Sequence, residues 1–147
     1  MKAQARVFAA GSLALALGLG MSTAASASGD SITVSNAHAF ARGALVTVTV
    51  TVTCTPQTDS QGVVHNQVDG WAALSQSVRH GQITSASGYF PTLTCNDQPQ
   101  TAQVTITPGT LAFRKGTAVV TALAFDNSLN GFLIPNFGEG PTVIKIS

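Results

Sequence analysis

The stretch Ala44–Cys54, ALVTVTVTVTC, constrains the fold of this chain more than any other segment. Valine and threonine alternate strictly from Val46 to Thr53, which is the two-residue period of a β-strand with one buried face. Both residue types are β-branched and favour strands over helices. Because the valines hold the even-numbered positions and Cys54 follows the same parity, its thiol is predicted to point into the core.

The two-residue period recurs along the chain between clusters of Gly, Pro, Asn and Asp, which mark turns. It predicts seven strands, over Ser31–Ser35, Ala44–Cys54, Gln67–Arg79, Gln82–Cys95, Thr101–Pro108, Gly116–Asp126 and Thr142–Ser147. We expect a bend at Gly88 and Pro91. The strand from Gly116, apolar on both faces, should be central. This pattern favours an all-β fold, a single antiparallel β-sandwich of the immunoglobulin-like type.

The first 27 residues have the features of a cleavable signal peptide. Lys2 and Arg6 supply the positive start, Val7–Met21 is apolar, and the run from Ala25 to Ala27 fits the small-residue cleavage rule. The apolar stretch is short for a membrane span, and no stop-transfer pattern follows it. We therefore expect residues 28–147 to form one secreted, extracellular domain with no membrane span.

Charge narrows the class of partner. Without Lys2 and Arg6, the seven basic residues fall to five, against six acidic ones. Nucleic-acid binders need a basic excess to displace counterions from phosphates, so this balance argues against that role. Only 9% of the residues are charged, which suits a compact exported domain.

Cys54 and Cys95 are the two cysteines of the chain. An even pair in an exported protein predicts one disulfide, which would stabilise the fold by about 4 kcal/mol in the chain-entropy model. Leu93 and Cys95 share a face, so the second thiol is also predicted to point inward. Two isolated cysteines are too few for zinc, and we expect no cofactor.

If successive strands alternate in direction, both cysteines lie at one end of the domain, and the charges separate by sign. The loops at the cysteine end hold the acidic residues Asp30, Asp59, Asp69, Asp97, Asp126 and Glu139, together with His65. The opposite end holds Arg42, Arg79, Arg114, Lys115 and Lys145, together with His38 and His80. One interpretation is that charges simply follow loops and that the sorting is chance.

Two functional interpretations of this polarity stay open. The acidic end could take Ca²⁺, with Asp59, Asp97 and Asp126 as the candidate ligands, although no calcium-loop motif is present. The basic end could hold an anionic polymer of the cell envelope.

The segment Asn127–Pro141 is predicted to be a long loop at the acidic end. Its apolar residues Phe132, Leu133, Ile134 and Phe137 either plug the end of the fold or form a binding loop. Trp71, the single tryptophan, is interpreted as a core residue near the disulfide.

Catalysis is disfavoured. Asp59, Ser60 and His65 share a loop, but no framing motif supports a catalytic triad, and we assign no catalytic residue. The favoured function is a non-catalytic binding or envelope-associated module, whose partner is an envelope polymer or another secreted protein. The alternatives are a secreted hydrolase with a loop-built site at the acidic end and a calcium-stabilised structural domain.

Three stretches also carry a family resemblance: VTVTVTC at Val48–Cys54, TLTCNDQPQTAQVTITP at Thr92–Pro108, and AFRKGTAVVTALAF at Ala112–Phe125. In these the chain resembles small secreted actinobacterial proteins of unassigned function. The resemblance implies an exported immunoglobulin-like β-sandwich and supplies no catalytic residue.

Overall fold

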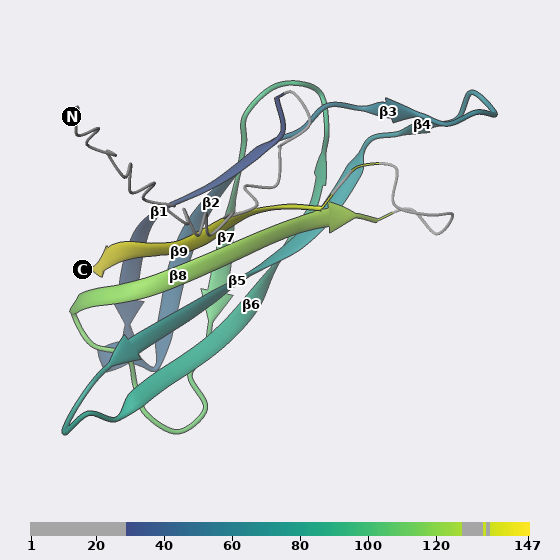
Figure 1. The fold of residues 1–147 in the computed structure, drawn as a ribbon. Coiled ribbons are helices and arrows are strands. Elements are labelled where there is room, and N and C mark those ends of the chain that lie inside the picture. The colour runs from purple at the N-terminus through teal and green to yellow at the C-terminus, as the bar shows by residue number, and fades with distance from the viewer. Residues whose placement is uncertain (1–28, 128–133, 135) are drawn as a thin grey trace, which may run out of the picture.

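The computed structural model describes residues 29–127, 134 and 136–147 (Figure 1). The strands are β1 (Ser31–Phe40), β2 (Leu45–Thr53), β3 (Gln57–Thr58), β4 (Val64–His65), β5 (Gln67–Ser77), β6 (Ile83–Thr94), β7 (Gln100–Ile106), β8 (Gly116–Asp126) and β9 (Phe137–Ile146). A short 3₁₀ turn, η1 (Ala41–Gly43), is the single helical element among these residues. The all-β prediction is therefore confirmed.

Seven of the strands form one sheet in the order β6-β5-β8-β9-β1-β2-β7, and β3 and β4 form a separate hairpin. Neighbours in the large sheet are antiparallel, except that β1 and β9 run parallel where Ala37 lies opposite Ile146. Ser147 completes this junction, because its N–H donates to Ala37 O at 3.0 Å and its O accepts from Ala39 N–H at 3.1 Å. The expectation of a purely antiparallel fold is wrong at this junction, and the sheet is mixed.

The large sheet curls until its two end strands, β6 and β7, pack against each other, so that it is nearly barrel-shaped (Figure 1). Gly88 of β6 allows this approach, because a Cβ added there would lie 2.3 Å from Thr105 O of β7. The register of β5 and β6 is regular at Gly88, which lies opposite Ala72. It shifts at Pro91, in the part of β6 that faces the segment between Val68 and Gly70. A bulge tolerates proline because no ladder hydrogen bond is needed there.

The core lies inside the curl and contains the even-numbered residues of β2. Val46, Val48, Val50 and Val52 are at most 1% exposed, and Cys54 is buried with them, as their parity predicts. Cys54 and Cys95 form the predicted disulfide, with a Cα–Cα distance of 4.8 Å. The bridge joins the ends of β2 and β6, which are not neighbours in the sheet.

Two strands are longer than predicted. β1 continues to Phe40, past an irregularity at Asn36, whose φ is 50°. β9 begins at Phe137, five residues earlier than predicted. The residues from Phe137, which were predicted to form a loop, pair instead with β8, beginning with Phe137 opposite Ala124. The register between β8 and β9 shifts between the pairs Val120–Thr142 and Ala122–Glu139, and Pro141 lies in this irregular part of β9. Strand β8 is central, between β5 and β9, as its two apolar faces predict.

Trp71 does not lie in the core, so its interpretation as a core residue is wrong. Burial in β5 alternates, and Gly70, Ala72 and Leu74 point inward while Trp71 is half-buried on the opposite face. The inward space at Gly70 is filled by the ring of Phe90, whose Cζ would lie 2.0 Å from an added Cβ. Phe90 thus takes the core position expected for the tryptophan.

Candidate functional site

A row of large side chains crosses the outward face of β6, β5 and β8. Tyr89, Trp71 and Leu123 are direct partners on these three adjacent strands, and Gly138 of β9 lies opposite Leu123. Tyr89 is 76% exposed, and Trp71 and Leu123 are half-buried. We call Tyr89, Trp71 and Leu123 the aromatic row.

The strands around the aromatic row extend this surface. Phe125 lies two residues beyond Leu123 on the same side of β8, opposite Asp69. Toward the other end of the sheet, Val119 and Val143 are partners on β8 and β9, and both are exposed. We call the outward side of β6, β5, β8 and β9 the outer face.

Small and hydroxyl-bearing residues lie between the aromatic row and the other exposed apolar residues of the outer face, which include Ile83 of β6. The small and hydroxyl-bearing residues are Ala73, Ser75, Ser85, Ser87 and Thr121. Among the described outward positions of these strands, the charged residues are Asp69 toward one end and Lys145 near the other. Asp69 Oδ1 accepts a hydrogen bond from Thr92 Oγ1 at 2.6 Å. Asp69 lies two residues from Trp71 on the same side of β5, and from Trp71 toward Lys145 the outer face is uncharged and combines apolar and hydroxyl groups.

Sequence reasoning missed this surface, although the parity that reveals it is present in the sequence. Trp71 alternates with Ala72 and Leu74, so it belongs to the opposite face from those core residues. Gly138 contributes to the packing of the row, because an added Cβ would lie 3.2 Å from Leu123 Cδ1 and 2.8 Å from Ala122 O.

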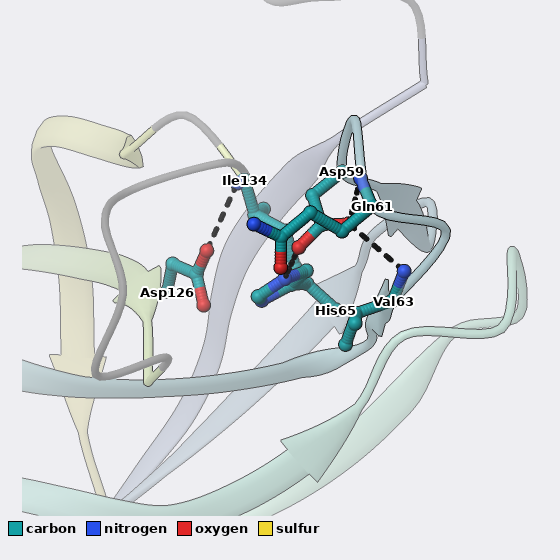
Figure 2. Close-up of polar contacts among 6 residues, drawn as sticks. All are labelled: Asp59, Gln61, Val63, His65, Asp126 and Ile134. Atoms are coloured by element: carbon teal, nitrogen blue, oxygen red, sulfur yellow. Dashed lines mark hydrogen bonds and ion pairs between the residues drawn. The ribbon is translucent and has the colours of Figure 1, made fainter.

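The second candidate site is the acidic end of the domain. There the carboxylate of Asp59 makes hydrogen bonds within the β3–β4 turn (Figure 2). Its Oδ1 accepts hydrogen bonds from the N–H groups of Gln61 and Val63, both at 2.8 Å. Its Oδ2 lies 3.2 Å from His65 Nε2. The bond from Val63 is the largest cause that lowers the pKa of Asp59 below its usual value. These contacts tie the β3–β4 turn together.

Of the other two calcium candidates, Asp126 makes a hydrogen bond through its carboxylate and Asp97 makes one through its backbone. Asp126 is buried, and its Oδ2 accepts from Ile134 N–H at 3.1 Å (Figure 2). Asp97 has a φ of 60°, and its N–H donates to Cys54 O at 3.1 Å. The part of the chain that the structure describes contains no group of three or more His, Cys, Asp or Glu residues arranged to hold a metal ion. The three aspartates are therefore not gathered into one site.

The predicted loop Asn127–Pro141 holds four apolar residues that were singled out from the sequence. Phe132 and Leu133 lie outside the described residues. Ile134 is fully buried, and Phe137 is 8% exposed and belongs to the core. Ile134 and Phe137 are therefore buried apolar side chains of the core.

The fold and the outer face define a disulfide-bonded, all-β protein with a curled mixed sheet. A scan against protein-family models, a search of curated proteins and a search of solved structures each found no match to this chain. The disulfide indicates a non-reducing environment. Within the described residues, no helix has the length and apolar character needed to cross a membrane.

Proposed function

We propose that this chain is an exported, non-catalytic binding module that contacts an uncharged polysaccharide through its outer face. Residues 1–27 would direct export and be removed, and residues 28–147 would act outside the cell or in its envelope. The disulfide between Cys54 and Cys95 supports this location, because such bonds persist in oxidising compartments.

We further propose that the domain is an immunoglobulin-like β-sandwich. In that description β1, β2 and β7 form one layer, and β6, β5, β8 and β9 form the other. The pairing of Ala37 with Ile146 would join the layers at one edge, and the disulfide would join them through the core. The strand order supports this assignment, since the β1–β9 junction is the single parallel step in the described sheet.

The observation that carries the functional proposal is the aromatic row. Apolar patches on the surface of a soluble domain commonly mark binding sites, and Trp and Tyr are enriched at the centres of such sites. Here Trp71 and Tyr89 are direct cross-strand neighbours on an open face. The row therefore offers two adjacent rings to a ligand without further rearrangement of the backbone.

The chemistry of the outer face favours sugars as the ligand. Pyranose rings present apolar C–H groups that pack on aromatic rings, while their hydroxyls exchange hydrogen bonds with serine and threonine side chains. Ser87 and Thr121 supply such groups beside the row, being partners of Ala73 from the two neighbouring strands. From Trp71 toward Lys145 the outer face presents no charge, which matches an uncharged polymer, because a charged ligand would lose hydration there without an opposite partner.

Trp71 provides the test, because it is the single tryptophan and its fluorescence reports directly on the proposed surface. We expect soluble neutral oligosaccharides, such as cello- and chito-oligomers, to change the tryptophan emission in a saturable way. In a pull-down on insoluble neutral glycans, Tyr89→Ala should weaken binding about tenfold, since it removes one central aromatic contact.

Ile83→Ala is the matched control, because Ile83 is 70% exposed on the same strand but lies opposite Ser77, away from the row. Binding should persist in this variant. The proposal fails if no neutral glycan changes the emission or retains the wild-type protein. It also fails if Tyr89→Ala and Ile83→Ala bind equally well.

A further inference from the structure

The end of the domain opposite the disulfide gathers basic side chains from three connections. Arg42 lies in η1, Arg79 lies in the turn between β5 and β6, and Arg114 with Lys115 precede β8. The three connections lie at the same end because each comes directly before a strand, β2, β6 or β8, that runs toward the disulfide end. The alternating strand directions predicted from the sequence place these basic residues in the same way.

All four cationic residues border one concave pocket of about 420 Å³, which we call the basic pocket. Phe113 and Gly43 also line it. An adjoining depression of about 140 Å³ is bordered by three of the same cations, Arg42, Arg79 and Arg114. The residues that border these two concavities include no Asp or Glu. Four positive side chains therefore converge on one space.

The loop that carries Arg114 and Lys115 is held on both sides. Phe113 is 1% exposed, and its N–H donates to Gly43 O at 3.0 Å. Thr84 Oγ1 donates to Leu111 O at 2.5 Å. Gly43 permits this close packing, because its φ is 88° and an added Cβ would lie 1.7 Å from Phe113 O.

The buried side chain of Gln76 fixes the next residue of the loop. Its Oε1 accepts from Arg114 N–H at 2.7 Å, and its Nε2 donates to Arg114 O at 2.8 Å. Arg114 itself is exposed. The backbone below the basic pocket is thus held in place while the side chains above it reach solvent, which lowers the ordering cost of binding.

Among the residues that the structure describes, the four basic side chains of the basic pocket have no acidic partner within salt-bridge distance. The salt bridge found among the described residues joins His65 to Asp59, which belong to the β3–β4 hairpin at the far end of the domain. Four like charges around one space repel each other, and a multivalent anion would relieve that repulsion. A monovalent carboxylate would neutralise only part of it.

We propose that the basic pocket binds a phosphate group. A guanidinium presents planar pairs of N–H donors that match two oxygens of a tetrahedral oxyanion, and lysine adds a compact charge. Arg42, Arg79 and Arg114 supply three such guanidinium groups, and Lys115 supplies the ammonium. The phosphate belongs either to a small molecule or to a phosphate-rich polymer. This site is separate from the outer face and does not depend on the function proposed for it.

The test measures binding of inorganic phosphate, pyrophosphate and long-chain polyphosphate to the purified, disulfide-bonded protein. Calorimetric titration should detect saturable binding of at least one of them that weakens as salt rises. The double variant Arg79→Gln with Arg114→Gln should bind at least about tenfold more weakly, because it removes two charge-assisted contacts. Its thermal midpoint should stay near wild type in buffer without phosphate.

Lys115→Gln and Lys145→Gln form a matched pair, since each removes one positive charge at the same end of the domain. Lys115 borders the basic pocket, whereas Lys145 lies opposite Thr117 on β9 and does not border it. Lys115→Gln should weaken phosphate binding, and Lys145→Gln should leave it within about twofold of wild type, because exposed charges at a distance are screened.

The source of the phosphate follows from comparing ligands. Comparable affinity for inorganic phosphate and polyphosphate, counted per site, identifies a small-molecule ligand, whereas binding of polyphosphate alone identifies a polymer. The proposal is overturned if none of the three ligands binds at millimolar concentration. It is equally overturned if Lys115→Gln and Lys145→Gln weaken binding to the same extent, which would reveal a response to net charge only.

Discussion

Gln76 bonds both polar groups of the Arg114 backbone, accepting from its N–H at 2.7 Å and donating to its carbonyl oxygen at 2.8 Å. The same Nε2 also lies 3.2 Å from Thr117 O. A side chain that is 5% exposed thereby makes the contacts that a neighbouring strand would otherwise supply. The relationship links the core of β5 to the loop that presents two of the four basic-pocket cations.

Gln76→Met should therefore destabilise the domain, because it keeps the side-chain length and leaves the backbone groups of Arg114 without their partners. We expect a loss of about 2–3 kcal/mol in the free energy of unfolding, measured by urea denaturation. Gln67→Met is the control on the same strand, since Gln67 is exposed. Equal stability of the two variants would contradict the role given to Gln76.

Glu139 makes a comparable bridge between β9 and β1. Its Oε2 accepts from Val34 N–H at 2.5 Å, and its Oε1 accepts from Thr142 Oγ1 at 3.0 Å. The paired register of the two strands is limited to Ala37 and Ile146, so the carboxylate joins them where that ladder does not extend. This role also moves Glu139 from the predicted loop at the acidic end into the body of the sheet.

Glu139→Ala should cost about 2 kcal/mol in the free energy of unfolding, since it leaves a backbone N–H without its charged acceptor. The sharper readout is hydrogen exchange by NMR, in which the Val34 amide should exchange faster in the variant than in wild type. Glu139→Gln retains an acceptor oxygen and should show a smaller change. Unchanged exchange at Val34 in Glu139→Ala would refute the bridge.

The confirmed sequence-based predictions came from asking which residues of a strand are apolar and which side of the strand they face. The alternation in Val46–Thr53 placed the valines and Cys54 in the core, and the two apolar faces of Gly116–Asp126 placed that strand at the centre of its neighbours. The first result depends on the local period of two, and the second depends on apolar residues at both parities of one strand; the sequence carries both signals directly. The same rule places Trp71 on the outward side of its strand, opposite to Ala72 and Leu74, whereas the general tendency of a single tryptophan to be buried predicts the core.

The remaining features depend on contacts between distant segments. The β3–β4 hairpin is held by Asp59, and its two-residue strands are too short to give a periodic signal. The pairing of Phe137 with Ala124 makes a strand from Gly- and Pro-rich sequence because β8 supplies the partner. The basic pocket likewise forms only when three connections meet, although alternating strand directions already placed its residues at one end.

Asp59 gives the hairpin a predictable pH dependence. Its pKa is lowered below the usual 3.8, first by the hydrogen bond from Val63 N–H. Because the folded-state pKa lies below the unfolded one, the carboxylate stabilises the hairpin fully above about pH 4. That contribution is lost as the pH falls through the folded-state pKa.

Asp59→Asn should consequently loosen the turn at neutral pH and differ less from wild type in strong acid. The amide signals of Gln61 and Val63 report this change by NMR, since both groups donate to Asp59 Oδ1. Asp97→Asn serves as a control, because it changes an acidic residue outside the hairpin. A variant whose Gln61 and Val63 signals match wild type at pH 7 would contradict the assignment.

Phe137 allows a direct test of the plug interpretation. Phe137→Ala should lower the free energy of unfolding by about 3–4 kcal/mol, because it removes a buried ring and leaves a cavity. Tyr89→Ala removes a ring from the exposed outer face and should have a much smaller effect on stability. If Phe137→Ala unfolds at the same urea concentration as wild type, the ring does not close the core.

The disulfide between Cys54 and Cys95 should contribute strongly to stability because it joins strands that are not sheet neighbours. It closes a loop between positions 41 residues apart, for which the chain-entropy model gives about 4 kcal/mol. Cys54→Ala with Cys95→Ala should therefore unfold at a markedly lower temperature than wild type. A reducing agent should lower the wild-type midpoint toward that of the variant and leave the variant unchanged. Intact-mass analysis of the oxidised protein must show the loss of two hydrogens, and two free thiols in that sample would refute the bridge.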